Sequence, residues 1–133
     1  MRIVFADAFY FVARLNARDQ HHQRVVSFSR ELRAALLTTD WVLMEVADAL
    51  AASECRSRVR AFVTHLRQSA ACEVVPASRE LFDHSLDLYH QYADKGWTLT
   101  DCSSILVMRE RGLLDVLTAD HHFEQAGCNL LLK

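Results

Sequence analysis

The sequence is poor in the residues that interrupt regular structure: its 133 residues include three glycines and one proline. So few turn formers argue against a many-stranded β-sandwich and against a linker-rich chain. No apolar run approaches the ~18 residues that a membrane span requires. The sequence also contains no P-loop, GxSxG or GxGxxG motif. We therefore expect no membrane association, and nucleoside-triphosphate, serine-hydrolase and dinucleotide-binding functions lack support.

Lysine is also scarce, since the sequence has 13 arginines and only two lysines. With 15 basic and 17 acidic residues the formal net charge is −2, which argues against a strongly basic nucleic-acid coat or a polybasic membrane binder. An enzyme that acts on nucleic acid stays open, because a catalytic domain can gather its acids in one pocket. Arg56, Arg58, Arg60 and Arg67 could form a basic face, although a solvated helix surface is the commoner arrangement.

The four cysteines show no metal-binding or disulfide pattern. They include no CxxC pair and no cysteine–histidine spacing typical of zinc, and they predict reduced, mostly buried thiols in a cytoplasmic protein. The apolar segment at residues 3–13 imitates a signal peptide, but Asp7 interrupts it, so we expect none. With 51% hydrophobic and 24% charged residues, the composition predicts one globular domain over residues 1–133.

Short β-branched runs alternate with segments of helical period along the chain. The runs predict strands at residues 2–6, 36–39, 72–75, 115–119 and 129–132. Helices are predicted at residues 9–15, 25–36, 40–53, 59–71, 79–95, 101–111 and 121–125. Thr39, Ser78 and Thr100 are the expected caps, and the helix after Ser78 is expected to bury Leu81, Phe82, Ser85, Leu88, Tyr89 and Tyr92. This alternation predicts an α/β fold, with helices on both faces of a mostly parallel central sheet.

Four acids occupy positions that suggest a shared site. Asp7 follows the first strand, Asp101 begins a helix, and Asp120 follows the strand at residues 115–119. Glu45 lies mid-helix among mostly apolar neighbours that include Trp41. Ligands of such sheets bind at the carboxyl ends of the strands, and a carboxylate in apolar surroundings is usually paired or functional. We therefore expect the four carboxylates to converge.

Converging carboxylates repel one another and require a cation. At ~4 Å and an effective dielectric constant of ~20, each pair costs about 4 kcal/mol, and no lysine or histidine in a matching position offsets it. An all-carboxylate site favours Mg²⁺ or Mn²⁺ over zinc. Such an ion lowers the pKa of a bound water and clamps a phosphate. Hydrolysis of a phosphodiester is the reaction that this arrangement suits best.

Each acid also has an ordinary structural interpretation. An acid in the first turn of a helix, such as Asp101, complements the helix dipole, and Asp7 and Asp120 could be turn formers. The combination favours function, because Asp7 interrupts an apolar stretch and Glu45 shares a helix face with Trp41. Both are poor positions for a solvated charge.

Four segments resemble the PIN-domain family, specifically the VapC-like toxins of type II toxin–antitoxin pairs. They are VFAD (4–7), TTDWVLMEV (38–46), LTDCSSI (99–105) and LTADHHFEQAG (117–127), which cover nearly the whole chain in order. The resemblance implies a three-layer α/β/α PIN-like domain with a central parallel sheet. It also implies a Mg²⁺-dependent endoribonuclease that hydrolyses RNA phosphodiester bonds. Residue by residue, Asp7, Glu45, Asp101 and Asp120 match the family's acidic quartet, with Glu45 as a further metal ligand or an orienter of the attacking water.

The chain departs from the family pattern at two places. Ala8 and Phe9 follow the first aspartate, where many relatives carry a small hydroxyl residue, and His122 stands where some carry a further acid. The second departure predicts one firmly held ion. The resemblance further implies a cognate antitoxin and a homodimer.

Other residues near these motifs have two interpretations each. Thr100, Ser103 and Thr118 could tune the site through hydrogen bonds or satisfy caps and the core. His122 could contact substrate or be a solvated surface residue, and the pair His121–His122 is expected to chelate poorly because adjacent helical side chains point in different directions.

Two alternatives to a ribonuclease stay open at this point. A receiver-type phosphoacceptor domain shares the doubly wound sheet and an acid pocket, but it needs a lysine there, and Lys95 and Lys133 lie in the wrong sequence context. A non-catalytic PIN-like module that binds RNA or protein is the other alternative, against which the intact quartet argues.

Overall fold

A five-stranded parallel sheet forms the centre of the molecule in the computed structural model, which describes residues 1–133. The strands are β1 (Ile3–Ala6), β2 (Ala35–Thr39), β3 (Cys72–Val75), β4 (Asp115–Leu117) and β5 (Asn129–Leu130). Their order is β3-β2-β1-β4-β5, and every neighbouring pair is parallel. The predicted central parallel sheet is therefore confirmed.

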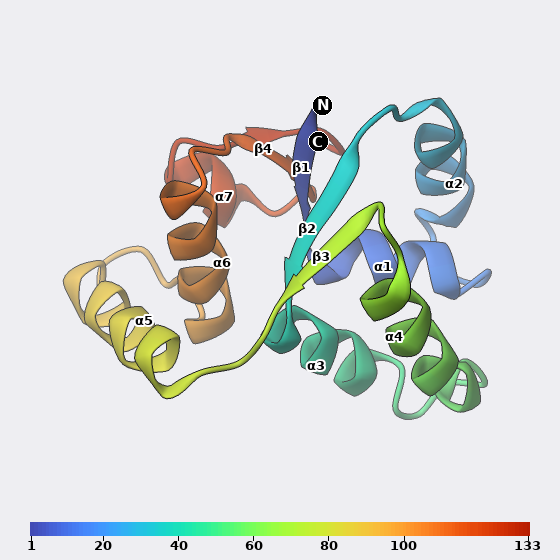
Figure 1. Cartoon of the computed structure of the whole chain (residues 1–133), viewed down its shortest axis with the longest axis horizontal. Helices are drawn as coiled ribbons and strands as arrows, with labels where there is room; N and C mark the ends of the chain where they lie inside the picture. Colours follow the sequence, from blue (N-terminus) through green and yellow to red (C-terminus); the bar gives the residue numbers. More distant parts are fainter.

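Seven α-helices cover both faces of this sheet. They are α1 (Ala8–Leu15), α2 (His22–Glu31), α3 (Asp40–Ala49), α4 (Val59–Gln68), α5 (Arg79–Gln91), α6 (Leu99–Glu110) and α7 (His121–Gln125), with a 3-10 turn η1 (Arg56–Arg58) before α4. Helices α1, α2 and α4 lie on one side of the strands, and α5, α6 and α7 lie on the other (Figure 1). Helix α3 lies where β2 ends (Figure 1). The three-layer α/β/α fold is thus confirmed.

Strand β1 is the centre of the core and the origin of the site. Val4, Phe5 and Ala6 are fully buried, as expected for a strand covered on both faces. The chain places β2 and β3 on one side of β1 and then β4 and β5 on the other. This reversal of strand order lies between β1 and β4, and open α/β sheets bind their ligands outside the carboxyl ends of the strands at such a point.

Several predicted elements extend too far. The predicted helix at 25–36 is wrong at its end, because α2 stops at Glu31 and Leu36 pairs with Val4 within the sheet. The helices predicted to end at 53 and 71 stop at 49 and 68, and β4 and β5 are shorter than predicted. Apolar residues such as Leu50, which is buried just beyond α3, continue the pattern into loops that pack on the core.

Helix α5 buries a narrower stripe than predicted. Ser78 caps it as expected by accepting the Leu81 N–H at 3.1 Å. However, Phe82 and Tyr89, predicted to face inward, are 41% and 44% exposed. Helix α5 packs mainly against α6 and not on the sheet, so only the stripe of Leu81, Ser85 and Leu88 is covered.

All four cysteines are free, with Cys55 and Cys102 buried and the other two half-buried. None of the helices combines the length and the apolar character that crossing a membrane requires.

Candidate metal centre

Asp7 is held at the end of β1 by contacts from two neighbouring strands. Thr38 on β2 donates its hydroxyl to the Ala6 carbonyl at 2.9 Å and so fixes the backbone just before Asp7. Asp7 occupies the N-cap position of α1, but its side chain does not cap that helix. Instead its Oδ2 accepts the Thr118 hydroxyl at 2.9 Å. The carboxyl group is therefore fixed while its residue is only 6% exposed.

Asp101 is fixed by a capping box at the start of α6. The Thr98 hydroxyl accepts the Asp101 N–H at 3.0 Å, and Asp101 Oδ2 accepts the Thr98 N–H at 3.1 Å. The predicted cap at Thr100 is therefore wrong, because α6 begins at Leu99. Both threonines are suitable caps, but only Thr98 has the T-x-x-D spacing that lets the two residues bond reciprocally.

Removal of this cap should destabilise the fold measurably. Thr98→Ala is expected to lower the free energy of unfolding by about 1 kcal/mol, the usual effect of losing an N-cap hydroxyl. Thr98→Ser retains the hydroxyl and should stay close to wild type. Urea denaturation of the three proteins measures the difference, and equal stability of Thr98→Ala and wild type would contradict the assigned cap.

Asp120 caps α7 at the end of the segment that follows β4. Its Oδ1 accepts the His122 N–H at 2.9 Å, and its own N–H donates to the Thr118 hydroxyl oxygen at 3.2 Å. Thr118 thus bonds Asp7 and Asp120 at once, and it is fully buried. Of the two interpretations that the sequence left open for Thr118, these hydrogen bonds favour the one in which it contacts the acids.

Glu45 reaches the same place from α3. It is half-buried, and its carboxylate has no hydrogen-bond or ion-pair partner in the protein. Burial raises the pKa of Glu45 to about 7, and repulsion from Asp7, Asp101, Asp120 and Asp48 contributes to the rise. A carboxyl group with no donor and several anionic neighbours is poorly stabilised in its charged form.

The four acids share one electrostatic environment. Burial raises the pKa of Asp7 to about 6, against the hydrogen bond from Thr118, and the charges of Asp101 and Asp120 raise it further. Since the same two aspartates also raise the pKa of Glu45, the structure brings all four predicted acids together.

What sets these carboxylates apart is that they lie together, buried or half-buried, without an arginine or lysine partner. Six other acids pair with an arginine or lysine: Asp40, Glu54, Glu73, Asp94, Asp115 and Glu124. None of the quartet does, and only histidine approaches Asp101 and Asp120. A set of buried oxygen donors with uncompensated negative charge fits a hard divalent cation.

His122 lies inside this site. The sequence had left open whether this histidine contacts substrate or is a solvated surface residue. Its Nδ1 is 2.9 Å from Asp101 Oδ2 and 3.6 Å from Asp120 Oδ1, and the side chain is 21% exposed. The expectation that His121 and His122 point apart is wrong. Ligand atoms of Asp120, His121 and His122 all lie within 4.8 Å of one another, because both rings turn toward the residue that caps their short helix.

The remaining candidate residues have structural roles. The Ser103 hydroxyl donates to the Thr100 carbonyl at 2.7 Å within α6. Thr100 and Ser103 also line a small hollow with Trp41, Phe82, Ser85 and Leu99, between α3, α5 and α6 and next in sequence to Asp101.

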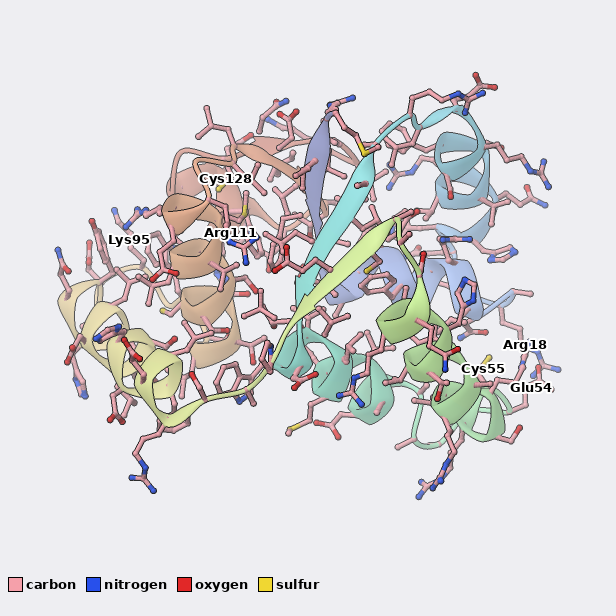
Figure 2. The ribbon with its side chains drawn as sticks, in the orientation of Figure 1. Arg18, Glu54, Cys55, Lys95, Arg111 and Cys128 are labelled. Carbon is pink, nitrogen blue, oxygen red and sulfur yellow. The ribbon has the colours of Figure 1, made fainter.

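The predicted basic residues lie outside the carboxylate cluster. Arg56, Arg58 and Arg60 are exposed on η1 and α4, and Arg67 pairs with Asp40 at 2.8 Å. η1 and α4 lie across the sheet from α6 (Figure 1), and the neighbouring pair Arg18–Glu54, 3.2 Å apart, marks the outer corner by η1 (Figure 2). The four predicted arginines therefore form a solvated helix surface.

Neither lysine provides the contact that a receiver-type domain needs. Lys95 is 3.5 Å from Asp94, on the outer side of α5 and α6 (Figure 2). Lys133 is 2.6 Å from Glu124 on α7. Because both ammonium groups are engaged with other acids, the structure gives the receiver hypothesis no support.

Comparisons with known proteins identify the family and support the fold. A family model for the PIN domain matches residues 4–127. No curated protein matches the chain in sequence. Among solved structures, the chain is similar to VapC20 of Mycobacterium tuberculosis, described as a sarcin–ricin loop cleaving toxin. The TM-score is 0.84 at 21% sequence identity, over 95% of this chain and 96% of that one, which supports the fold. Since the family model covers most of the sequence, this chain belongs to the PIN-domain family, whose members are nucleases.

Proposed function

We propose that this protein is a Mg²⁺-dependent endoribonuclease that hydrolyses RNA phosphodiester bonds. The observation that carries the proposal is the uncompensated quartet of Asp7, Glu45, Asp101 and Asp120 at the carboxyl end of the sheet. Four acids without an arginine or lysine partner cost folding energy, and a divalent ion removes that cost. Mn²⁺ is the expected substitute, because it accepts the same oxygen ligands.

The residues have separate roles in this proposal. Asp7, Asp101 and Asp120 hold the ion, because hydrogen bonds fix each of them: the Thr118 hydroxyl bonds Asp7, and backbone N–H groups at the starts of α6 and α7 bond Asp101 and Asp120. Glu45 lacks such bonds and either completes the ligand set or orients the attacking water. A divalent ion at such a site lowers the pKa of water and neutralises charge on the phosphate under attack. Without a bound cation the carboxylates would keep the site anionic and would repel a substrate phosphate.

RNA is the favoured substrate for two reasons. The structurally similar VapC20 is described as cleaving an RNA loop. The hollow that includes Thr100, next in sequence to Asp101, is lined by the aromatic rings of Trp41 and Phe82, whose centroids are 6.3 Å apart. Aromatic faces stack on unpaired bases, so these rings can contact a base of the substrate.

We further propose that the protein is the toxin of a type II toxin–antitoxin pair and acts in the cytoplasm. Four free cysteines fit a reducing compartment. Met44, Phe82 and Tyr89 expose apolar surface on α3 and α5, which a cognate antitoxin or a second copy of the chain in a homodimer can cover. A small DNA-binding protein encoded in the adjacent reading frame would support the pairing.

A metal-depletion assay tests the nuclease activity. Purified protein should cleave a structured RNA in Mg²⁺ or Mn²⁺, stop when EDTA is added, and recover when either ion is supplied in excess. A non-catalytic RNA-binding module would retain RNA without cutting it under all three conditions. Cleavage that continues unchanged in EDTA would refute the proposed mechanism.

A further inference from the structure

His122 makes two hydrogen bonds to two of the site's carboxylates. Its backbone N–H donates to Asp120 Oδ1 at 2.9 Å, and its ring Nδ1 lies 2.9 Å from Asp101 Oδ2. Asp101 belongs to α6 and Asp120 precedes α7. One residue therefore sets the position of carboxylates from two separate elements.

The proton on this ring can be assigned from its surroundings. Nδ1 faces Asp101 Oδ2 and, at 3.6 Å, Asp120 Oδ1, and ionised carboxylate oxygens only accept hydrogen bonds. Nδ1 must therefore carry hydrogen and donate. The other ring nitrogen, Nε2, points away from these two carboxylates, because the two nitrogens of an imidazole ring have diverging directions.

The hydrogen bonds that the Asp101 carboxylate accepts from the protein all go to one of its two oxygens. Its Oδ2 accepts from both the Thr98 N–H and His122 Nδ1, whereas Oδ1 receives no hydrogen bond from the protein. A carboxylate held in this way by one oxygen is oriented and has the other oxygen free for a ligand. Together with Thr118, which bonds both Asp7 and Asp120, His122 completes a chain of contacts through all three aspartates.

We propose, on the basis of the proposed metal-dependent function, that His122 is a positioning residue whose ring N–H holds Asp101 in the orientation that binds the divalent ion. In this role His122 is a donor to a ligand and does not itself bind the ion.

Three substitutions distinguish a positioning histidine from a histidine that binds the ion directly. His122→Ala removes the donor, whereas His122→Asn puts an amide N–H at the same number of bonds from the backbone as Nδ1. His121→Ala is the matched control, because His121 is 71% exposed and 3.7 Å from Asp120. The fold should survive each change, because α7 is held by fully buried Phe123 and by the 3.0 Å bond from Trp97 Nε1 to Gln125.

Binding of Mn²⁺, measured from the electron paramagnetic resonance signal of the free ion, gives the readout without turnover. His122→Ala should bind Mn²⁺ about tenfold more weakly than wild type, the usual effect of losing a hydrogen bond to a metal ligand. His122→Asn should recover most of that loss, and His121→Ala should bind as wild type does. Electron spin-echo spectra of the bound Mn²⁺ should show no nitrogen coupling from a directly bound imidazole.

The contrary results are equally specific. Wild-type affinity in His122→Ala, equal weakness of the Ala and Asn variants, or a directly bound nitrogen that disappears in His122→Ala would each overturn the positioning role. A loss in His121→Ala as large as in His122→Ala would also overturn it in favour of a histidine chelate. If wild type itself binds no Mn²⁺, or if Asp7→Asn binds as wild type does, the proposed function fails instead.

Discussion

Asp7→Asn should lower the rate of RNA cleavage by about a thousandfold or more, because loss of a charged metal ligand removes several kcal/mol of stabilisation and each 1.36 kcal/mol is tenfold in rate. Asparagine has the shape of aspartate and retains an oxygen that can accept the Thr118 hydroxyl. The loss therefore reflects charge and not misfolding. Single-turnover cleavage in saturating Mg²⁺ measures it, and unchanged cleavage by the purified variant would rule out the mechanism.

The same substitution should make the metal-free protein more stable. The pKa of Asp7 rises from 3.8 to about 6 in the fold, so near neutral pH the buried charge destabilises the folded state by at most about 3 kcal/mol. Asp7→Asn removes this charge, and its midpoint in urea with EDTA should rise. Asp115→Asn is a suitable control, because Asp115 pairs with Arg2 and its pKa is lowered. That variant should lose a little stability and keep full cleavage activity.

The metal-free protein should also lose stability as the pH rises from about 5 to about 7.5. The pKa values of Asp7 and Glu45 are higher in the fold, about 6 and about 7, than the ordinary 3.8 and 4.5. The folded state thus binds more protons than the unfolded state in this interval, and stability falls with pH. We expect a total loss of about 2 to 3 kcal/mol, with the contribution of half-buried Glu45 reduced by solvent screening.

Urea denaturation in EDTA at several pH values measures this slope. Three acids have a lowered pKa: Asp40, Glu73 and Asp115. Their contribution to the free energy of unfolding changes only at lower pH, outside this interval. The double variant Asp7→Asn/Glu45→Gln should show a much flatter profile, and Mg²⁺ at a thousand times its dissociation constant should restore about 4 kcal/mol to wild type at pH 7.5. A wild-type profile as flat as that of the double variant would contradict the shared acidic site.

The sequence predicted the order of the strands and helices better than their ends. Strand β3 and helix α7 begin and end at the predicted residues. For β3, the short apolar run and the following Pro76 leave little choice of where the strand ends. The end of α2 was misjudged because Leu32 and Leu36 continue its apolar period, although Leu36 pairs in the sheet. An apolar residue at such a boundary can belong to the helix or to the strand. The choice depends on tertiary pairing, about which local periodicity carries no information.

The site shows the same division. Asp7 and Glu45 could be found because each places a charge in apolar surroundings, and Asp101 and Asp120 because they lie at helix starts inside segments that resemble the family's motifs. The contact of His122 with Asp101 could not be found, since it depends on how α7 docks beside α6. The cap of α6 was wrongly placed at Thr100, because either threonine before Asp101 is a suitable cap and the reciprocal bonds with Asp101 belong to Thr98.

The pairing of β1 with β4 also bears on how the protein acquires activity as it folds. Phe5 pairs with Val116 and Ala6 with Leu117. The two strands that precede Asp7 and Asp120 therefore pair although most of the chain separates them in sequence. Contacts of such long sequence separation are slow to form. In a chain in which only β1, β2 and β3 have paired, Asp7 and Glu45 are in place. Asp120 is not yet in place, and the hydrogen bond from Thr118 to Asp7 has not formed. Nuclease activity should therefore appear only once β1 and β4 have paired, and ion affinity measured during refolding should report that pairing.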